Sequence, residues 1–174
     1  MIRNRIRVIT LSASALAAGL ALTGAGMAAA SPATPASASA TRTGTEYIQE
    51  MSTSATSPVS QVIAHGAFTA AGTDTQTSQN TDLLKFPGGT FVATSKATSV
   101  RNHVDSGTCA STVTIKLTYT LGKGTGRFAG ITGTGHATTT VLNLAARTAH
   151  GGCSPTASIA QQSLVEAAGP VTLR

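Results

Sequence analysis

The sequence predicts an all-β domain in which antiparallel strands form a barrel or a sandwich. The chain is rich in Thr, Ser, Gly, Ala and Val, and only 10% of its residues are charged. That mixture favours strands and turns over helices. One segment, residues 111–120, alternates strictly between apolar and polar side chains. Glycine-rich turn signals recur between the apolar segments, as they do in small barrels and sandwiches.

Residues 111–120 form the clearest predicted strand. Val113, Ile115, Leu117 and Tyr119 share one face, and the other face carries threonines and Lys116. This period of two is typical of a strand with one buried side. The further predicted strands are 45–53, 61–70, 90–98, 131–143 and 171–173. Residues 159–168 fit a short helix or a strand. The predicted turns are 72–79, 87–89, 106–107, 122–126 and 151–152.

The first 40 residues have the layout of a secretory signal peptide. A basic start is followed by an uncharged run and then by small residues and prolines. We expect cleavage after Ala40, with cleavage after Ala30 as the alternative. A membrane anchor is a further alternative, but the run consists largely of small residues, which drive insertion weakly. The prediction is a single secreted, extracellular domain, residues 41–174, without stable membrane insertion after cleavage.

Charge and cysteine content agree with an exported binding domain or enzyme better than with a nucleic-acid binder. Three of the 12 basic residues leave with the signal and no acid does, so the net charge falls from +6 to +3. The remaining lysines and arginines are scattered, which excludes a nucleic-acid partner on charge. The two cysteines, Cys109 and Cys153, are predicted to form a disulfide, because an even count in an exported chain favours one. Two separate buried thiols are the alternative.

Residues 119–135 form the most specific stretch of the sequence. They read as a strand, a glycine turn, one buried aromatic residue and a second strand that begins with glycines. Its key positions are Gly124, Gly126, Phe128, Gly130 and Gly133. We expect Gly124 and Gly126 to allow left-handed turn angles and Phe128 to plug one end of a sheet.

This pattern resembles the G-x-G-x-F-x-G-x-x-G hairpin of the allene oxide cyclase and dirigent-like β-barrels, including small secreted actinobacterial proteins. Residues 66–74 are similar to an earlier strand and turn of that group. The resemblance implies an eight-stranded antiparallel β-barrel with a central cavity. It implies no catalytic residue at any position of this chain, so function must be argued from the site.

Motifs for cofactors and metals fail on context. The sequence from Gly124 to Ala129 fits G-x-G-x-x-A, but a Thr-rich strand follows it where a dinucleotide site needs a helix. Asp105-Ser106 lacks the flanks of a hydrolase site and is typical of a turn. No histidine pair has the spacing of a structural metal site. The sequence therefore predicts neither a cofactor nor a metal.

Five residues are candidates for the interior of a cavity: Glu46, Glu50, His65, His136 and Glu166. Strand parity sets His65 opposite Phe68 and His136 opposite Ile131, so exposure is the favoured interpretation for both histidines. Glu46 and Glu50 share one face of the first strand. A paired-carboxylate site is conceivable there, but a solvated sheet edge is the favoured interpretation. Glu166 lies in the segment that fits a helix or a strand, so the sequence leaves open whether it enters the mouth of a barrel.

The leading functional hypothesis is a secreted barrel that binds a small apolar molecule in its cavity. The first alternative is a cyclase or isomerase of the resembled group. The second is a non-catalytic module that interacts with the cell envelope through an apolar patch or an edge strand. The sequence predicts no particular ligand and no oligomeric state.

Overall fold

The computed structural model describes residues 41–53 and 57–174. The predicted signal peptide lies outside the described residues. The eight strands are β1 (Arg42–Ser52), β2 (Val59–Gly66), β3 (Ala70–Ser78), β4 (Thr81–Phe86), β5 (Gly89–Asp105), β6 (Ala110–Gly122), β7 (Thr132–Arg147) and β8 (Cys153–Leu173). One 3₁₀ turn, η1 (Gly126–Phe128), precedes β7, and the described residues contain no α-helix.

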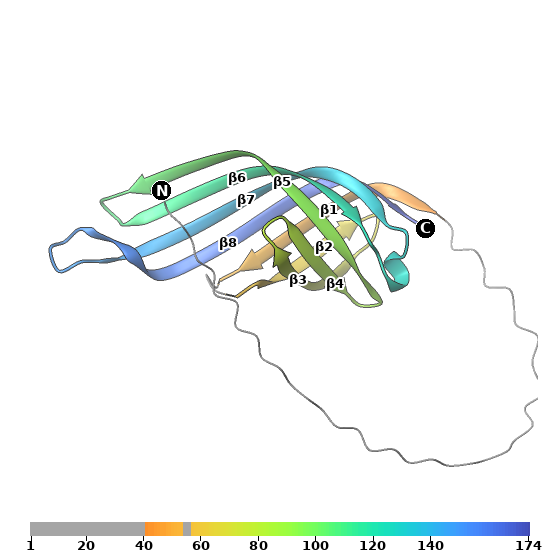
Figure 1. Ribbon diagram of the computed structural model, residues 1–174, viewed down its shortest axis with the longest axis horizontal. Helices are drawn as coiled ribbons and strands as arrows, with labels where there is room; N and C mark the ends of the chain where they lie inside the picture. Colours follow the sequence, from red (N-terminus) through yellow and green to blue (C-terminus); the bar gives the residue numbers. More distant parts are fainter. Residues whose placement is uncertain (1–40, 54–56) are drawn as a thin grey trace, which may run out of the picture. The chain divides into compact units, whose positions relative to one another are not determined.

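The eight strands form one antiparallel sheet that closes on itself (Figure 1). Each strand pairs with the next along the chain, and β1 pairs with β8 from Arg42–Leu173 to Ser52–Ser163. The prediction of an all-β domain is confirmed. The closed order β1 to β8 gives a single ring of strands in place of the two sheets of a sandwich.

The structure decides one open point of the strand prediction and corrects another. Residues 159–168, for which helix and strand were both open, lie within β8. Residues 72–79, predicted as a turn, belong mostly to β3. Gly72 does not form a turn. It lets the neighbouring strand β4 come close, because a Cβ at this position would lie 2.1 Å from the Lys85 carbonyl oxygen. The chain reverses earlier, at Gly66, whose φ of 134° is a glycine conformation.

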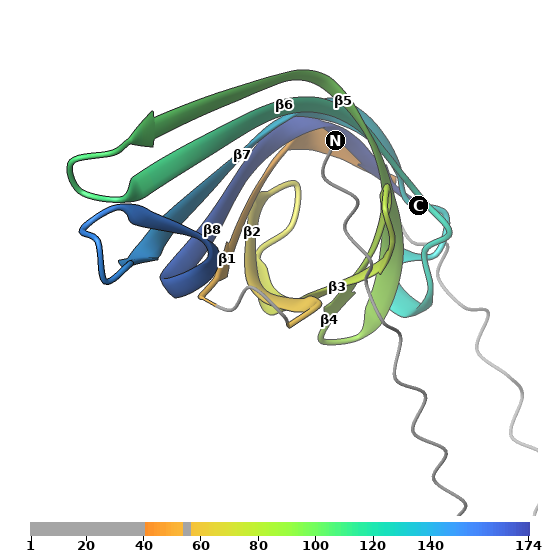
Figure 2. The ribbon, with the colours of Figure 1, turned by 60° about the vertical axis from the view of Figure 1, so that its left-hand side comes forward.

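The strands differ greatly in length, and the ring continues on one side as an open sheet. β8 has 21 residues and β5 has 17, whereas β2 has 8 and β4 has 6. Pairing of β4 with β5 stops at Thr94, and pairing of β1 with β8 stops at Ser163. Beyond those residues β5 to β8 pair only with one another and run out past β1 to β4 (Figure 2). We call residues 95–112 and 142–162 the extension.

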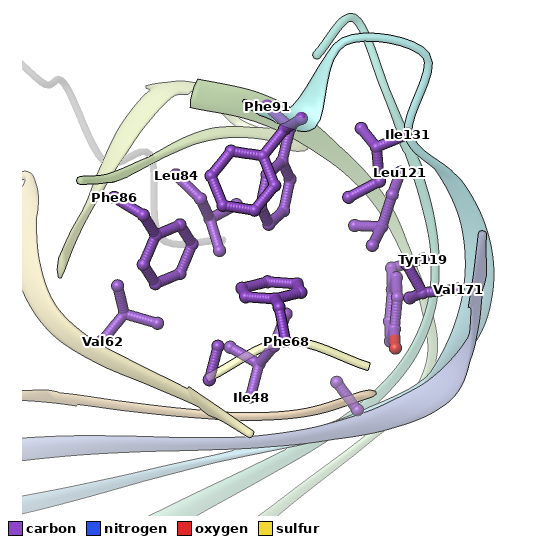
Figure 3. Close-up of a cluster of buried hydrophobic side chains, with 13 residues drawn as sticks. Ile48, Val62, Phe68, Leu84, Phe86, Phe91, Tyr119, Leu121, Ile131 and Val171 are labelled. Atoms are coloured by element: carbon purple, nitrogen blue, oxygen red, sulfur yellow. The ribbon is translucent and has the colours of Figure 1, made fainter. Parts of the chain in front are cut away.

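Figure 3 shows the opposite end of the ring, which is filled by aromatic side chains. All four phenylalanines of the chain gather there, with ring centroids 5.0–6.2 Å apart. We call Phe68, Phe86, Phe91 and Phe128 the aromatic plug. The Arg127 guanidinium covers the plug, 4.8 Å from the centroid of the Phe128 ring. The predicted plugging role of Phe128 is confirmed, since only 1% of it is exposed.

The glycines around Phe128 serve different needs. Gly126 and Gly130 have φ values of 56° and 76°, the left-handed region. Gly124 does not, which corrects the expectation of a left-handed angle there. It is needed for space, because a Cβ would lie 1.7 Å from the Phe128 carbonyl oxygen. Gly133 lies in β7 with Val171 and Pro170 close beside it.

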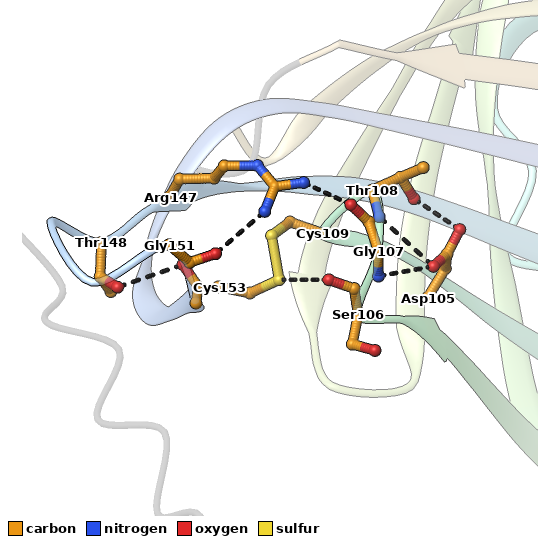
Figure 4. Close-up of a disulfide and its surroundings, with 10 residues drawn as sticks. Asp105, Ser106, Gly107, Thr108, Cys109, Arg147, Thr148, Gly151 and Cys153 are labelled. Atoms are coloured by element: carbon orange, nitrogen blue, oxygen red, sulfur yellow. Dashed lines mark hydrogen bonds between the residues drawn. A yellow bond between two sulfur atoms is a disulfide. The ribbon is translucent and has the colours of Figure 1, made fainter.

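The predicted disulfide is present and lies at the tip of the extension (Figure 4). It joins Cys109, in the β5–β6 turn, to Cys153, the first residue of β8, with a Cα–Cα distance of 5.3 Å. Arg147 ties the same two turns by donating hydrogen bonds to the carbonyl oxygens of Gly107 and Gly151. The disulfide and the Arg147 hydrogen bonds therefore both hold the tip.

Candidate functional site

A cavity of about 520 Å³ lies inside the ring, above the aromatic plug. It runs from Tyr119 and Leu121 toward the loop residues Pro58 and Asn80, where the short strands end. Its wall also includes Val100 and other residues of the extension, so the cavity opens on the side away from the plug. Such a space fits one small molecule.

The charges of the protein are divided between the two faces of the sheet. Four of the six acidic residues, Glu46, Glu50, Asp74 and Asp82, lie on the inner face or line the cavity. Every lysine and arginine of the described residues is exposed, and no lysine, arginine or histidine lines the cavity. The interior therefore carries acids without counter-charges.

Glu50 and Asp74 form a hydrogen-bonded carboxyl pair in the cavity wall. Glu50 projects from β1 and Asp74 from β3, across the intervening β2. Burial, with the neighbouring Asp74 charge second, raises the pKa of Glu50 to about 9. Burial also raises the pKa of Asp74, although the hydrogen bond with Glu50 opposes this. Glu50 thus keeps its proton at neutral pH and donates a hydrogen bond to Asp74.

Asp82 of β4 completes this group, and we call Glu50, Asp74 and Asp82 the acid cluster. Burial and the Asp74 charge raise the pKa of Asp82 to about 6. At neutral pH Asp82 is therefore mostly ionised, whereas Glu50 is protonated. The cluster presents a proton donor and carboxylate acceptors within one cavity.

Glu46 lies deeper, next to the plug, and has a structural partner. Its side chain is fully buried and accepts a 3.0 Å hydrogen bond from the Phe68 backbone N–H. Burial raises its pKa, and that hydrogen bond opposes the increase. Glu46 therefore fixes the turn that carries Phe68. Its second oxygen has no partner among the described residues.

Tyr119 of β6 is buried on the inner face of the ring, near Glu46. Its hydroxyl is buried and has no hydrogen-bond partner in the part of the chain that the structure describes. Burial, together with the nearby Glu46 charge, raises its pKa. Gly135 makes room for the ring, because a Cβ there would lie 2.5 Å from the Tyr119 oxygen. Gly169 of β8 lies against Gly135 and adds to this space.

The structure corrects the placement of several predicted candidates. Glu46 and Glu50 do not form a solvated edge, because β1 pairs with a neighbour on both sides and its acids point into the ring. His65 and His136 are exposed, in agreement with strand parity, and neither lines the cavity. Glu166 is exposed as well.

These outward residues share a shallow groove on the outer face of the sheet. Its volume is about 260 Å³, and His65, His136 and Glu166 line it. The Tyr47 ring stacks on His65 there, with a centroid distance of 5.0 Å and an interplanar angle of 12°. The groove lies between side chains of neighbouring strands. Of the residues that the structure describes, Glu166 is the only acidic one that lines it.

Asp74 and Asp82 were not among the predicted site residues, although the sequence holds a signal for both. Asp82 has the same strand parity as Leu84 and Phe86, and Asp74 has the same parity as Gly72 and Ala70. The apolar members of each set face the interior, so the aspartates must do so too. The prediction of a turn over 72–79 hid this parity for Asp74.

Comparisons with protein-family models, with curated proteins and with solved structures found no match. Within residues 41–53 and 57–174, no group of His, Cys, Asp and Glu side chains is suited to hold a metal ion. The same residues include no helix of the length and apolarity needed to span a membrane.

Proposed function

We propose that the protein is exported and that its cavity binds a small, largely apolar molecule. The observation that carries this proposal is the cavity itself, which stays open above a filled plug. Apolar side chains make up much of its wall: Ile48, Leu84, Ala93, Leu117, Ala137, Val165 and Ala167. The alanines leave space that larger residues would fill, and a few polar groups would orient the ligand.

Two further features support the proposal. The basic and apolar start of the sequence, together with the Cys109–Cys153 disulfide, is compatible with an oxidising, extracellular setting. The ring of eight antiparallel strands is compatible with the barrel that the allene oxide cyclase and dirigent-like resemblance implies. An interior filled by side chains would favour the alternative of a module that interacts with the cell envelope. The cavity inside the ring supports ligand binding instead.

A titration with the neutral fluorescent probe N-phenyl-1-naphthylamine tests binding. We expect the purified exported protein to bind one equivalent. Ala167→Phe places a ring in the cavity and should weaken binding at least tenfold. Ala71→Phe, on the outer face of β3, is the matched control and should bind as the wild type does. Thermal melting confirms that both variants are folded. Absence of saturable binding, or equal binding by both variants, would contradict the proposal.

The acid cluster supports a second candidate, an isomerase or cyclase. A protonated Glu50 and a mostly ionised Asp82 offer a general acid and a general base in one cavity. Glu50→Gln keeps the size of the side chain and removes the proton exchange. Incubation with an extract of the producing culture, followed by mass spectrometry, should reveal a product made by the wild type and not by Glu50→Gln. Identical product profiles would remove this candidate.

A further inference from the structure

The cavity is acidic in a protein whose exposed surface is basic. Its wall holds Glu50, Asp74 and Asp82 and contains no lysine, arginine or histidine. Buried carboxyl groups are costly unless they are paired or hydrogen-bonded. Lysines and arginines outnumber the acidic residues in this chain, but every one of them in the described residues is exposed to solvent. The ionised part of the cluster therefore has no basic partner in the cavity wall, and a cationic ligand would supply one.

One carboxylate oxygen in the cluster is unused. Asp74 is only 6% exposed, and its Oδ1 has no hydrogen-bond partner among the described residues. Asp74 lines the cavity, next to the space that a ligand would occupy. A buried acceptor without a partner destabilises the fold, and a hydrogen-bond donor brought to this carboxylate would relieve that destabilisation.

We propose that the molecule bound in the cavity carries a protonated amine, which binds at the acid cluster while its apolar body contacts the rest of the wall. This inference rests on the proposed function and names the ligand class. The ammonium donates to Asp74 and Asp82, and Leu117, Ala137 and Val165 pack against the apolar part. An ammonium group has three donors and no acceptor, which matches a site made of carboxylates.

The ionisation of the cluster agrees with this ligand. Burial raises the pKa values of Glu50 and Asp82, so the cavity wall disfavours negative charge on them, and a bound cation would oppose that effect. The other titratable groups on the inner face are Glu46 and Tyr119, neither of which supplies a positive charge at neutral pH. A carboxylate ligand would meet repulsion from the ionised members of the cluster.

Three probes of equal shape and different charge test the proposal. Calorimetric titrations use 1-aminoadamantane, a cation, 1-adamantanol, which is neutral, and 1-adamantanecarboxylate, an anion. We expect the amine to bind at least tenfold more tightly than the alcohol, and the carboxylate to bind most weakly. Equal affinities for amine and alcohol, or tighter binding of the carboxylate, overturn the amine proposal and leave the proposed function standing. Absence of binding by all three probes overturns both.

Two variants locate the preference. Asp82→Asn, at the less buried end of the cluster, should reduce the ratio of amine to alcohol affinity at least fivefold while alcohol binding stays within twofold. Asp74→Asn should do the same, and thermal melting identifies folded protein. Glu166→Gln removes an acid from the outer face and is the matched control, so its ratio should equal that of the wild type. An unchanged ratio in folded Asp82→Asn overturns the assignment of the ammonium to this cluster.

The pH dependence gives a third readout. Asp82, with a pKa of about 6, becomes protonated as the pH falls from 7 to 5, while 1-aminoadamantane stays cationic. Amine affinity should therefore drop over that interval in the wild type and change much less in Asp82→Asn. The titratable groups that act on Asp82 in this titration are Asp74 and Glu50, and Glu46 and Tyr119 lie elsewhere on the inner face. A flat profile in the wild type overturns the role given to Asp82.

Discussion

The plugged end of the ring and the extension are held together by opposite means. At the plugged end, Phe91 and Phe128 are 0% and 1% exposed, and the rings contact one another in T-shaped and stacked pairs. In the extension, Val100, Val104 and Ile159 are 62%, 60% and 66% exposed. The extension instead has the disulfide and the Arg147 hydrogen bonds at its tip.

The difference shows how a chain with few large apolar residues distributes its stability. With only four phenylalanines and no tryptophan, it concentrates its aromatic surface at one end of the ring. The remaining strands gain less from burial, since apolar burial scales with the area removed from water. A covalent link across the tip compensates for that by restricting the unfolded chain. Pro155 in the free edge of β8 also discourages pairing with other chains.

The largest expected effect comes from opening the plug. Phe128→Ala leaves a cavity among the other rings of the plug, so we expect the free energy of unfolding to fall by about 3–5 kcal/mol. Urea denaturation measures the change. Tyr47→Ala, an aromatic truncation on the outer face, is the control and should lower stability by no more than about 1 kcal/mol. Equal losses in the two variants would show that the plug does not dominate the stability of the ring.

Removal of the disulfide should cause the next largest loss of stability. That loss should be concentrated in the extension, away from the plugged end. The loop between Cys109 and Cys153 spans 44 residues, for which chain entropy gives roughly 4 kcal/mol. We expect the Cys109→Ser/Cys153→Ser double variant to lose about 2–4 kcal/mol. Hydrogen exchange should accelerate first in the extension, while amides of β1 to β4 stay protected.

Arg147→Ala is the comparison for that experiment, since it removes the two Arg147 hydrogen bonds at the tip and leaves the disulfide intact. It should shift exchange in the extension by much less than the double variant does. Uniform acceleration over the whole ring in the double variant would mean that ring and extension open as one unit.

An effect of a different kind, a dependence of stability on pH, should arise in the ring. Burial raises the pKa of Glu50 from 4.5 to about 9 in the folded protein, so the folded state binds a proton that the unfolded chain releases. The stability contributed by this proton is complete below pH 4.5 and is lost as the pH rises through 9. Glu50→Gln should flatten that decline in urea denaturation, and Glu166→Gln should not. A decline of equal slope in Glu50→Gln would assign it to another group.

Alternation within a segment could be predicted from the sequence, because side chains of neighbouring residues in a strand point to opposite faces. That rule placed Val113, Ile115 and Tyr119 on one face and turned His65 and His136 outward. The Cys109–Cys153 pair and the buried position of Phe128 also followed from local features. The turn predicted over 72–79 failed because Gly72 and Asp74 are common in turns, and only the approach of β4 shows that they belong to a strand.

The sequence by itself determined the strand character of the chain, the cysteine pair and the face that Glu46 shares with Ile48 and Glu50. Only the tertiary structure decided that this face is the inside. β1 is an interior strand because it pairs with β8, more than a hundred residues away, and no local pattern encodes that pairing. Closure then brought Glu50, Asp74 and Asp82 from three strands into one cavity, where burial alters their ionisation. Local alternation determines which side chains share a face of a strand. Long-range strand pairing determines which of the two faces is buried inside the ring.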